Sequence, residues 1–182
     1  TTEIYTLSLH DALPISSTGS VYFHGDDLSQ LREADLVDMR RHRIGFVFQS
    51  FGLMPLLSAQ ENVELPLHIS GMPWRERGQL ATESLQAVGL GTRARHRPFE
   101  LSGGEQQRGS IARALVTQPE VVFADEPTGE LDASTARSIA ETLAEVAASR
   151  RATVIVATHD LVLAATAQRR VDLVDGQEVS QP

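Results

Sequence analysis

Two adjacent acidic residues follow an apolar run in the segment EVVFADEP at 120–127. Such a run predicts a strand buried on both faces of a parallel sheet. Asp125 and Glu126 then lie at the carboxyl end of that strand, where α/β proteins bind ligands. A carboxylate such as Asp125 can hold Mg²⁺, commonly through the water shell of the ion, and Glu126 can orient or deprotonate an attacking water. The alternative is an acidic pair that only caps the next turn.

A second candidate site is the glycine-containing segment LSGGE at 101–105. Gly103 and Gly104 allow backbone N–H groups to approach a ligand closely, and the helix that follows directs its positive end at an anion. Ser102 adds a hydroxyl donor. Ser102 and Glu105 also have the spacing of a capping box, so the segment predicts an ordinary helix start as well. The two interpretations are compatible.

Three more polar residues stand next to expected elements. Gln49 ends the apolar run IGFVFQ, Asp132 precedes an expected helix, and His159 follows the apolar run ATVIVAT. Taken singly, they are typical of a strand end, a helix N-cap and a structural histidine. Their order along the chain is what gives them weight.

The elements that must position these residues are short apolar strands that alternate with helices. The expected strands lie within 19–25, 44–49, 120–127 and 152–159, and a hairpin is expected around Asp175 and Gly176. The expected helices lie at 28–41, from about 58, at 75–88, from Gly103 to before Pro119, at about 133–150 and shortly after His159. This alternation predicts an α/β fold with a parallel sheet, and the helical stretch at about 50–115 predicts an inserted subdomain.

Gln49, LSGG, Asp125-Glu126, Leu131-Asp132 and His159 occur in the order of the Q-loop, signature motif, Walker B, D-loop and H-loop. The chain therefore resembles the ATP-binding subunits of ABC transporters over residues 18–180. The resemblance implies a P-loop NTPase-like ABC ATPase core with a parallel sheet and an inserted α-helical subdomain. Residues 52–67, GLMPLLSAQENVELPL, look most like cassettes of the lipoprotein-release and macrolide-export type.

The same resemblance implies ATP and Mg²⁺ as cofactors and assigns a role to each matching residue. Glu126 would be the general base on water, His159 would contact the γ-phosphate, Gln49 would sense the metal and the γ-phosphate, and Asp125 would support the metal. The nucleotide-binding residues would be Ser102, Gly103, Gly104 and Glu105 in the signature motif and Asp132 at the dimer interface.

The partners implied are a transmembrane permease subunit and a second cassette, in a homodimer or a pair of different cassettes. The expected location is cytoplasmic, peripheral at the inner face of the cell membrane. The expected function is ATP hydrolysis coupled to the permease, for export or lipoprotein release.

All 16 Lys or Arg positions of the chain are arginine, so lysine is absent. The family requires a loop G-x-x-x-x-G-K-[ST], whose lysine reaches the β- and γ-phosphates, and the 182 residues do not contain it. Residues 1–17 follow neither helical nor strand periodicity. We interpret them as a non-native-looking segment, similar to translated adapter sequence, ahead of a partial ABC ATPase domain at 18–182 that lacks the N-terminal P-loop part; a genuine but divergent N-terminus is the alternative. The alternative function is a catalytically dead fragment or regulatory module that pairs with an intact cassette.

Composition excludes other classes of protein. A formal net charge of -8 argues against a nucleic-acid partner, and the absence of cysteine excludes thiol nucleophiles, Cys-zinc sites and disulfides. No apolar stretch approaches the roughly 18 residues that span a bilayer. Gln49 and Ser102 lie 53 positions apart, which leaves no room for the long coiled coil of the chromosome-maintenance and DNA-repair branch.

Overall fold

The computed structural model describes residues 19–150 and 152–179. The segment 1–17 therefore lies outside the described residues. The chain divides into two compact units, one from Met39 to Thr166 and one that combines residues up to Asp38 with residues from Ala167. Every functional residue predicted from the sequence lies in the Met39–Thr166 unit.

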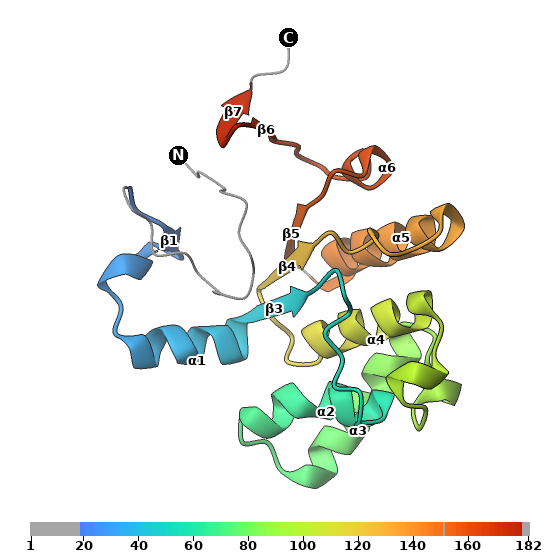
Figure 1. Cartoon of the computed structure of the whole chain (residues 1–182). Helices are drawn as coiled ribbons and strands as arrows, with labels where there is room; N and C mark the ends of the chain where they lie inside the picture. Colours follow the sequence, from blue (N-terminus) through green and yellow to red (C-terminus); the bar gives the residue numbers. More distant parts are fainter. Residues whose placement is uncertain (1–18, 151, 180–182) are drawn as a thin grey trace. The chain divides into compact units, whose positions relative to one another are not determined.

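A three-stranded parallel sheet forms the centre of the Met39–Thr166 unit (Figure 1). Its strands are β3 (Ile44–Val47), β4 (Val121–Asp125) and β5 (Thr153–Ala157), in the order β3-β4-β5. Val47 pairs with Ala124, and Asp125 pairs with Ala157. The three expected strands and their parallel arrangement are confirmed. Because parallel strands end at the same edge, the segments that follow β3, β4 and β5 start on one side of the unit.

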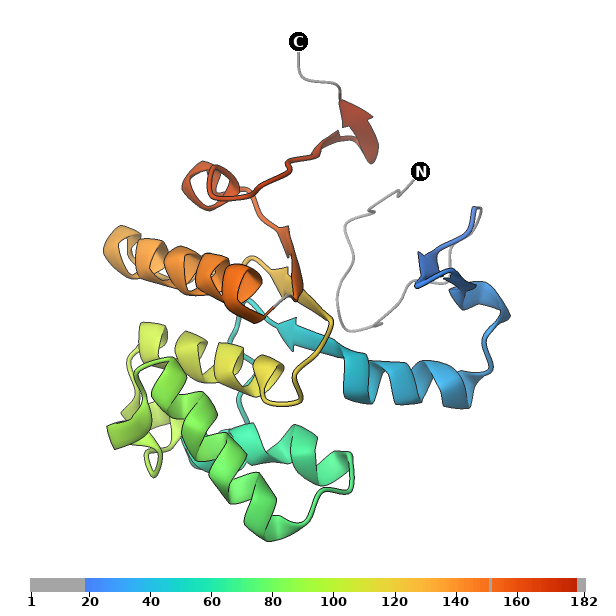
Figure 2. The same cartoon turned by 180° about the vertical axis from the view of Figure 1, so that it is seen from behind.

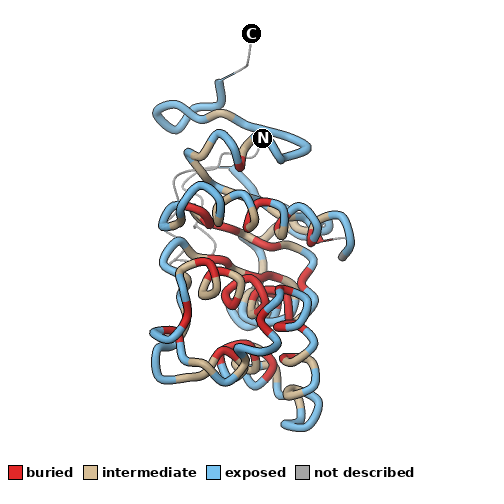
Figure 3. Tube along the Cα trace, turned by 90° about the vertical axis from the view of Figure 1, so that its right-hand side faces the viewer, coloured by how far each residue is buried: buried red, intermediate tan, exposed pale blue. Residues whose placement is uncertain are grey.

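Two helices, α4 (Gly103–Leu115) and α5 (Ala133–Arg150), cover one face of this sheet (Figures 1 and 2). The α5 stripe predicted from the sequence, Ile139, Leu143 and Val146, is buried in the same core as Ile111 of α4. The buried positions gather along these helices and the strands beside them (Figure 3).

The closeness of α4 to β3 depends on Gly45. A Cβ atom at this position would lie 2.4 Å from the backbone oxygen of Ala114 and 3.2 Å from Cγ of Pro119. A larger residue would therefore push the helix away from the sheet.

The prediction that β4 is buried on both faces is wrong, and β5 is not fully buried either. Along β4 only Val122 and Ala124 are buried, and along β5 residues alternate between half-buried and exposed. Phe46, Phe123 and Ile155 stand in register on the other face, and none of the three is fully buried, Ile155 being 37% exposed. The physical reason is that β5 is an edge strand and that α4 and α5 both cover the same face.

Helices α2 (Ala59–Ile69) and α3 (Trp74–Ala87) pack against each other and against α4. Ser58 caps α2: its hydroxyl accepts a hydrogen bond from the backbone N–H of Glu61, and its own N–H donates to the Glu61 carboxylate at 2.8 Å. The expected start at about Ser58 and the expected helix at 75–88 are both confirmed. Short 3₁₀ turns at Gly91–Arg93 and Pro98–Glu100 lead into α4.

The remaining elements belong wholly or partly to the other unit. Helix α1 (Glu33–Arg43) crosses the boundary and leads directly into β3. A hairpin joins β1 (Tyr22–Phe23) to β2 (Asp26–Asp27), followed by a 3₁₀ turn at Leu28–Gln30. A second hairpin joins β6 (Asp172–Val174) to β7 (Gln177–Val179), as the Asp-Gly pair at 175–176 predicts. None of the helices within 19–150 and 152–179 is long and apolar enough to cross a membrane.

Candidate functional site

The acidic pair predicted from EVVFADEP occupies the end of β4. Asp125 is the last residue of the strand, and Glu126 follows with a positive φ of 42°. The backbone N–H of Glu126 donates to the oxygen of Ala157, the last residue of β5, at 2.9 Å. A non-glycine residue in this conformation costs free energy, and such residues concentrate at functional sites. The strained turn directs the Glu126 side chain toward the segment that follows β5.

Three donors from the segment after β5 hold the Glu126 carboxylate. Oε1 accepts from the backbone N–H of His159 at 2.9 Å and from His159 Nδ1 at 2.8 Å. Oε2 accepts from the hydroxyl of Thr158 at 3.0 Å. Glu126 thus has a fixed orientation, whereas the His159 side chain is 85% exposed.

His159 and Asp125, at the strand ends, have shifted pKa values. The hydrogen bond and the charge of Glu126 raise the pKa of His159 above its ordinary value. Burial, and next the neighbouring charge of Glu126, raise the pKa of Asp125. Among the described residues, no hydrogen bond or ion pair reaches the Asp125 carboxylate, so its oxygens are available to a cation.

A second set of hydrogen bonds fixes the segment that carries His159. The Thr128 hydroxyl donates to Asp160 Oδ2 at 3.1 Å, and Asp160 Oδ1 accepts from the N–H of Val162 at 2.8 Å and of Leu163 at 3.4 Å. These backbone bonds cap the short helix α6 (Leu161–Ala164) and, above all that of Val162, lower the pKa of Asp160. The turn after β4 and the turn after β5 are therefore joined at two points.

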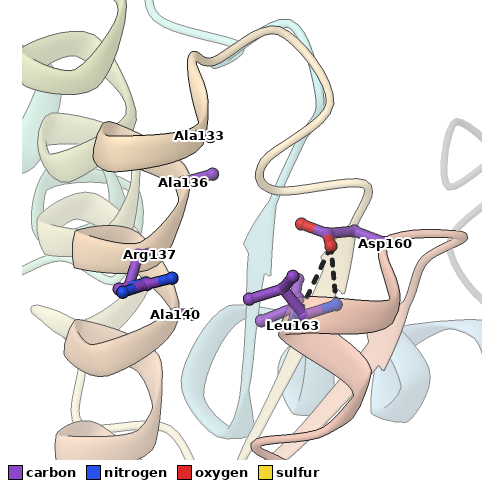
Figure 4. A pocket seen from close by; sticks show the side chains of 7 residues that line it. Ala133, Ala136, Arg137, Ala140, Asp160 and Leu163 are labelled. Atoms are coloured by element: carbon purple, nitrogen blue, oxygen red, sulfur yellow. Dashed lines mark hydrogen bonds between the residues drawn. The ribbon is translucent and has the colours of Figure 1, made fainter.

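A small hollow lies between α5 and α6 beside Asp160 (Figure 4). Its volume is about 120 Å³, and alanines of α5 with Val162 and Leu163 form most of its wall. None of the site residues predicted from the sequence lines it. Ligand pockets commonly measure about 300–1,000 Å³, so this hollow is too small for a nucleotide.

Gln49 lies two residues past the end of β3 and is exposed. Its Nε2 atom is 3.4 Å from the place that a Cβ on Gly129 would occupy. Gly129 closes the turn after Glu126, because its N–H donates to the Glu126 backbone oxygen at 3.0 Å. The structure therefore brings Gln49 next to the Glu126 turn, and its sensor role stays a prediction.

Helix α4 holds the loop that follows Gln49. The guanidinium of Arg113 donates to the backbone oxygens of Gly52 and, at 3.5 Å, Phe51, and burial lowers its pKa. Phe51 and Gly52 both have positive φ, 62° and 61°, so these bonds support a strained turn. The loop is ordered by contacts with α4 that its own sequence does not reveal.

The apolar side chains of the loop at 51–56 differ in their exposure. Leu56 is 80% exposed and Met54 50% exposed. Phe51 and Leu53 are half-buried, because Phe51 lies near Gly103 and Leu53 near Gly109 on α4. Met54 and Leu56 are thus the large apolar side chains that this described loop exposes.

LSGGE forms the start of α4, and its capping box is confirmed. Ser102 Oγ accepts from the Glu105 N–H at 3.3 Å, and the Ser102 N–H donates to the Glu105 carboxylate at 2.8 Å. That backbone bond is the main cause of the lowered pKa of Glu105, which also pairs with Arg93 at 3.3 Å. The first N–H groups of a helix carry a partial positive charge, which makes a helix start suited to an anion.

The two signature glycines have a packing reason besides their predicted ligand role. A Cβ on Gly104 would lie 2.4 Å from Cγ2 of Thr135, and one on Gly103 would lie 3.4 Å from Leu131. The start of α4 therefore touches the start of α5, and glycine permits the close approach.

Asp132 caps the start of α5. Its Oδ1 accepts from the N–H groups of Ser134 and Thr135 at 3.0 and 3.1 Å, and its Oδ2 accepts from the Thr135 hydroxyl at 2.6 Å. The hydroxyls, first that of Ser134, hold its pKa well below the usual range. The capping function is confirmed; the predicted role at a dimer interface stays a prediction.

The predicted residues form two groups. Gln49, Asp125, Glu126 and His159 meet at the carboxyl edge of the sheet, and the signature residues meet Asp132 where α4 and α5 begin. Among the described residues, no hydrogen bond or ion pair joins Ser102 or Glu105 to the acidic pair or to His159.

Three residues that connect the segments of the site were not predicted from the sequence: Thr158, Thr128 and Gln107. Thr158 directly precedes His159, and Thr128 lies two positions after Glu126, so their hydroxyls were a usable signal. Gln107 lies within α4, and no feature of the sequence around it indicated a connecting role.

This geometry fits a water-activating carboxylate beside a metal-supporting one. The described residues include no group of three or more His, Asp or Glu side chains that could hold a metal alone. Asp125 would thus hold Mg²⁺ together with ligand oxygens and water, which matches the way this ion binds in phosphate sites.

A parallel sheet with an acidic pair and a histidine at its strand ends, beside a helix that opens with LSGG, defines an ATP-binding cassette. The chain belongs to the ABC transporter family, whose sequence model matches residues 6–129. The match begins at residue 6, ahead of residue 18, from which the motifs carry the resemblance.

Two solved structures share the predicted fold. The ATP-binding cassette MJ0796, described as a bacterial ABC transporter cassette, has been solved as a dimer in a post-hydrolysis state with ADP and Pi and in a second dimeric structure. The TM-score is 0.78 in both cases. The identities are 41% and 43%, over 90% and 88% of this chain and 73% and 71% of the other. The predicted P-loop NTPase-like fold class is confirmed.

Similar curated proteins are lipoprotein-releasing system ATP-binding proteins, LolD. The relative from Geobacter metallireducens is 46% identical over 96% of this chain and 77% of its own length. The relative from Syntrophus aciditrophicus is 46% identical over 90% and 74%, and that from Pseudomonas fluorescens 45% over 96% and 77%. The predicted resemblance to the lipoprotein-release type is confirmed: the chain is an ABC transporter ATP-binding domain close to LolD.

Proposed function

We propose that this cassette binds ATP with Mg²⁺ and hydrolyses it to drive a membrane permease in lipoprotein release. The observation that carries the proposal is the Glu126 carboxylate, fixed by His159 and Thr158 at the carboxyl edge of the sheet. A carboxylate in a fixed orientation is suited to take a proton from an attacking water. The similarity to LolD supports the substrate class.

Each strand-end residue has a role in this proposal. Glu126 orients water and accepts its proton, and His159 directs Nε2 to the terminal phosphate. Asp125 would hold Mg²⁺ through water, and the ion would supply positive charge that offsets the phosphate charge. Gln49, beside the Glu126 turn, responds to the metal and to the terminal phosphate. Because phosphoryl transfer depends on position and charge, the rigid hydrogen bonds of Glu126 matter more than its basicity.

The signature residues act on a second copy. Ser102, Gly103 and Gly104, with Glu105 and Asp132, contact ATP held by the opposite cassette in a head-to-tail homodimer or paired cassette. The dimeric MJ0796 structures support this arrangement. The test uses a chain to which a P-loop has been added and which carries Glu126→Gln. In the presence of Mg-ATP, light scattering should detect a dimer. A monomer with ATP demonstrably bound would contradict the head-to-tail arrangement.

The permease contacts the exposed apolar side chains of Met54 and Leu56, near Gln49. An exposed apolar patch on such a domain marks an interface, and this one lies on the loop that Gln49 begins. In this proposal the cassette lies at the cytoplasmic face of the membrane beside its permease, and the similarity to LolD supports this location.

A second candidate function follows from the absence of lysine in these 182 residues. Arginine does not replace the P-loop lysine, because its planar fork does not fit where a compact ammonium contacts the phosphates. Residues 1–182 by themselves would then be a catalytically silent module that pairs with an intact cassette.

One experiment separates the two functions. ATPase activity and ATP binding are measured on residues 1–182, on a chimera in which residues 1–17 are replaced by a strand, P-loop and helix from a LolD relative, and on the Glu126→Gln form of each. We expect turnover that depends on Glu126 in the chimera alone. An inactive chimera that still binds ATP would overturn the hydrolytic role of Glu126, and turnover by residues 1–182 would refute the need for the loop.

A further inference from the structure

One amide side chain contacts both segments that carry the strand-end residues of the site. Gln107, on α4, has a fully buried side chain. Its Nε2 donates to the backbone oxygen of Phe48 at 3.4 Å and to that of Pro127 at 2.8 Å. Phe48 directly precedes Gln49, and Pro127 directly follows Glu126.

Only the N–H donors of the Gln107 side-chain amide form hydrogen bonds. Gln107 Oε1 is buried and has no hydrogen-bond partner among the described residues. If the amide turned over, Oε1 would face two carbonyl oxygens and both bonds would be lost, so one orientation is strongly preferred. A buried polar group that keeps one atom unsatisfied calls for an explanation beyond packing, because methionine would fill the same space.

We propose that Gln107 is a positioning residue that couples the loop bearing Gln49 to the turn bearing Glu126. A displacement of the Pro127 carbonyl pulls on the amide and, through its other N–H, on the Phe48 carbonyl. The functional meaning of this coupling rests on the proposed ATPase function, in which Gln49 and Glu126 must respond together to bound ATP. The signature helix thus carries the physical connection between sensor and base.

Gln106 provides a matched control one position away. Its Nε2 donates to the backbone oxygen of Leu101 at 3.1 Å, within the segment that leads into the same helix. Among the described residues, no hydrogen bond joins Gln106 to either of the two coupled segments, so Gln106→Met makes the same chemical change without breaking the connection.

Amide hydrogen exchange of residues 1–182 tests the proposal without nucleotide. The probes are the N–H of Phe51, bonded to Phe48, and that of Gly129, bonded to Glu126; the buried core amide of Leu85 reports global opening. In Gln107→Met both probes should exchange about tenfold faster relative to Leu85, the effect of losing one ordinary hydrogen bond. Gln106→Met should leave both unchanged. A change at one probe only, or equal changes in the two variants, would overturn the coupling.

A second measurement keeps Gln107 in place. Pro127→Ala loosens the turn after Glu126, and we expect faster exchange at Phe51 relative to Leu85 in the parent chain. The same substitution in the Gln107→Met background should have no effect at Phe51. An unaffected Phe51 in the parent chain, or an equal effect in both backgrounds, refutes transmission through Gln107. Because no ATP is present, neither result depends on whether the chain hydrolyses it.

Discussion

Gly104→Ala tests whether the second signature glycine is required for packing as well as for a ligand. The added Cβ would lie 2.4 Å from Cγ2 of Thr135, whereas carbon atoms in contact normally stay about 3.5–4.0 Å apart. Thr135 cannot simply rotate away, because its hydroxyl donates to Asp132 at 2.6 Å. The substitution must therefore either break that hydrogen bond or move the start of α4 away from α5.

The cost follows from these two options. Overpacking a well-packed contact costs about 1–3 kcal/mol, and any weakening of the exposed Thr135–Asp132 hydrogen bond comes in addition. We therefore expect the free energy of unfolding to fall by about 2 kcal/mol. With a urea m-value of about 2 kcal/mol/M, the midpoint should fall by about 1 M.

Urea unfolding of a double-mutant cycle is the assay. Thr135→Ser removes Cγ2 and keeps the hydroxyl, so it should destabilise the parent chain slightly and stabilise the Gly104→Ala form. Gly78→Ala is the matched control on α3, where the nearest atom to an added Cβ is Glu64 Oε1 at 3.8 Å. It should stabilise the chain by about 0.5–1 kcal/mol. Equal effects of Thr135→Ser in both backgrounds would refute the steric argument.

Three further outcomes follow from the structure. Glu126→Gln should lower the pKa of His159, measured by NMR titration. Because the pKa of His159 is raised in the folded chain, the stability that the His159–Glu126 pair contributes is present below the ordinary pKa of 6.5. This stability is lost as the pH rises through the pKa of His159 in the folded chain. An unchanged His159 titration in the variant contradicts the contact. Leu56→Asp should leave the urea midpoint unchanged and weaken permease capture by the P-loop chimera, whereas Leu53→Asp should lower the midpoint; the reverse pattern would place the interface elsewhere. Gly45→Ala should destabilise by about 1–3 kcal/mol in urea unfolding, and no loss would contradict the close approach of α4 to β3.

Much of the secondary structure follows from local pattern. The α5 helix begins after Asp132 because a carboxylate there satisfies its first N–H groups, and its apolar stripe repeats at the helical period. Ser58 and Ser102 mark helix starts by the same capping chemistry. These signals lie within a few residues of the structure they specify, so a single sequence is enough to find them.

Burial was less predictable. The apolar run in β4 predicted cover on both faces, yet Val121 and Phe123 remain half-buried while Val122 and Ala124 are buried. Apolar side chains in a sequence show that a strand can be buried. Whether they are buried depends on which helices cover the face of the sheet on which they lie. The same holds for Leu53, which α4 partly covers, and for Leu56, which it does not.

The sequence by itself determined the types and order of the chemical groups: Gln49, LSGG, Asp125-Glu126, Asp132 and His159. Only the tertiary structure decided which of them touch. Glu126 meets His159 across two adjacent parallel strands, and Gln107 reaches two segments 20 and 59 positions away. Such contacts depend on strand register and helix placement, which are set by the packing of the whole unit, and no local spacing encodes them.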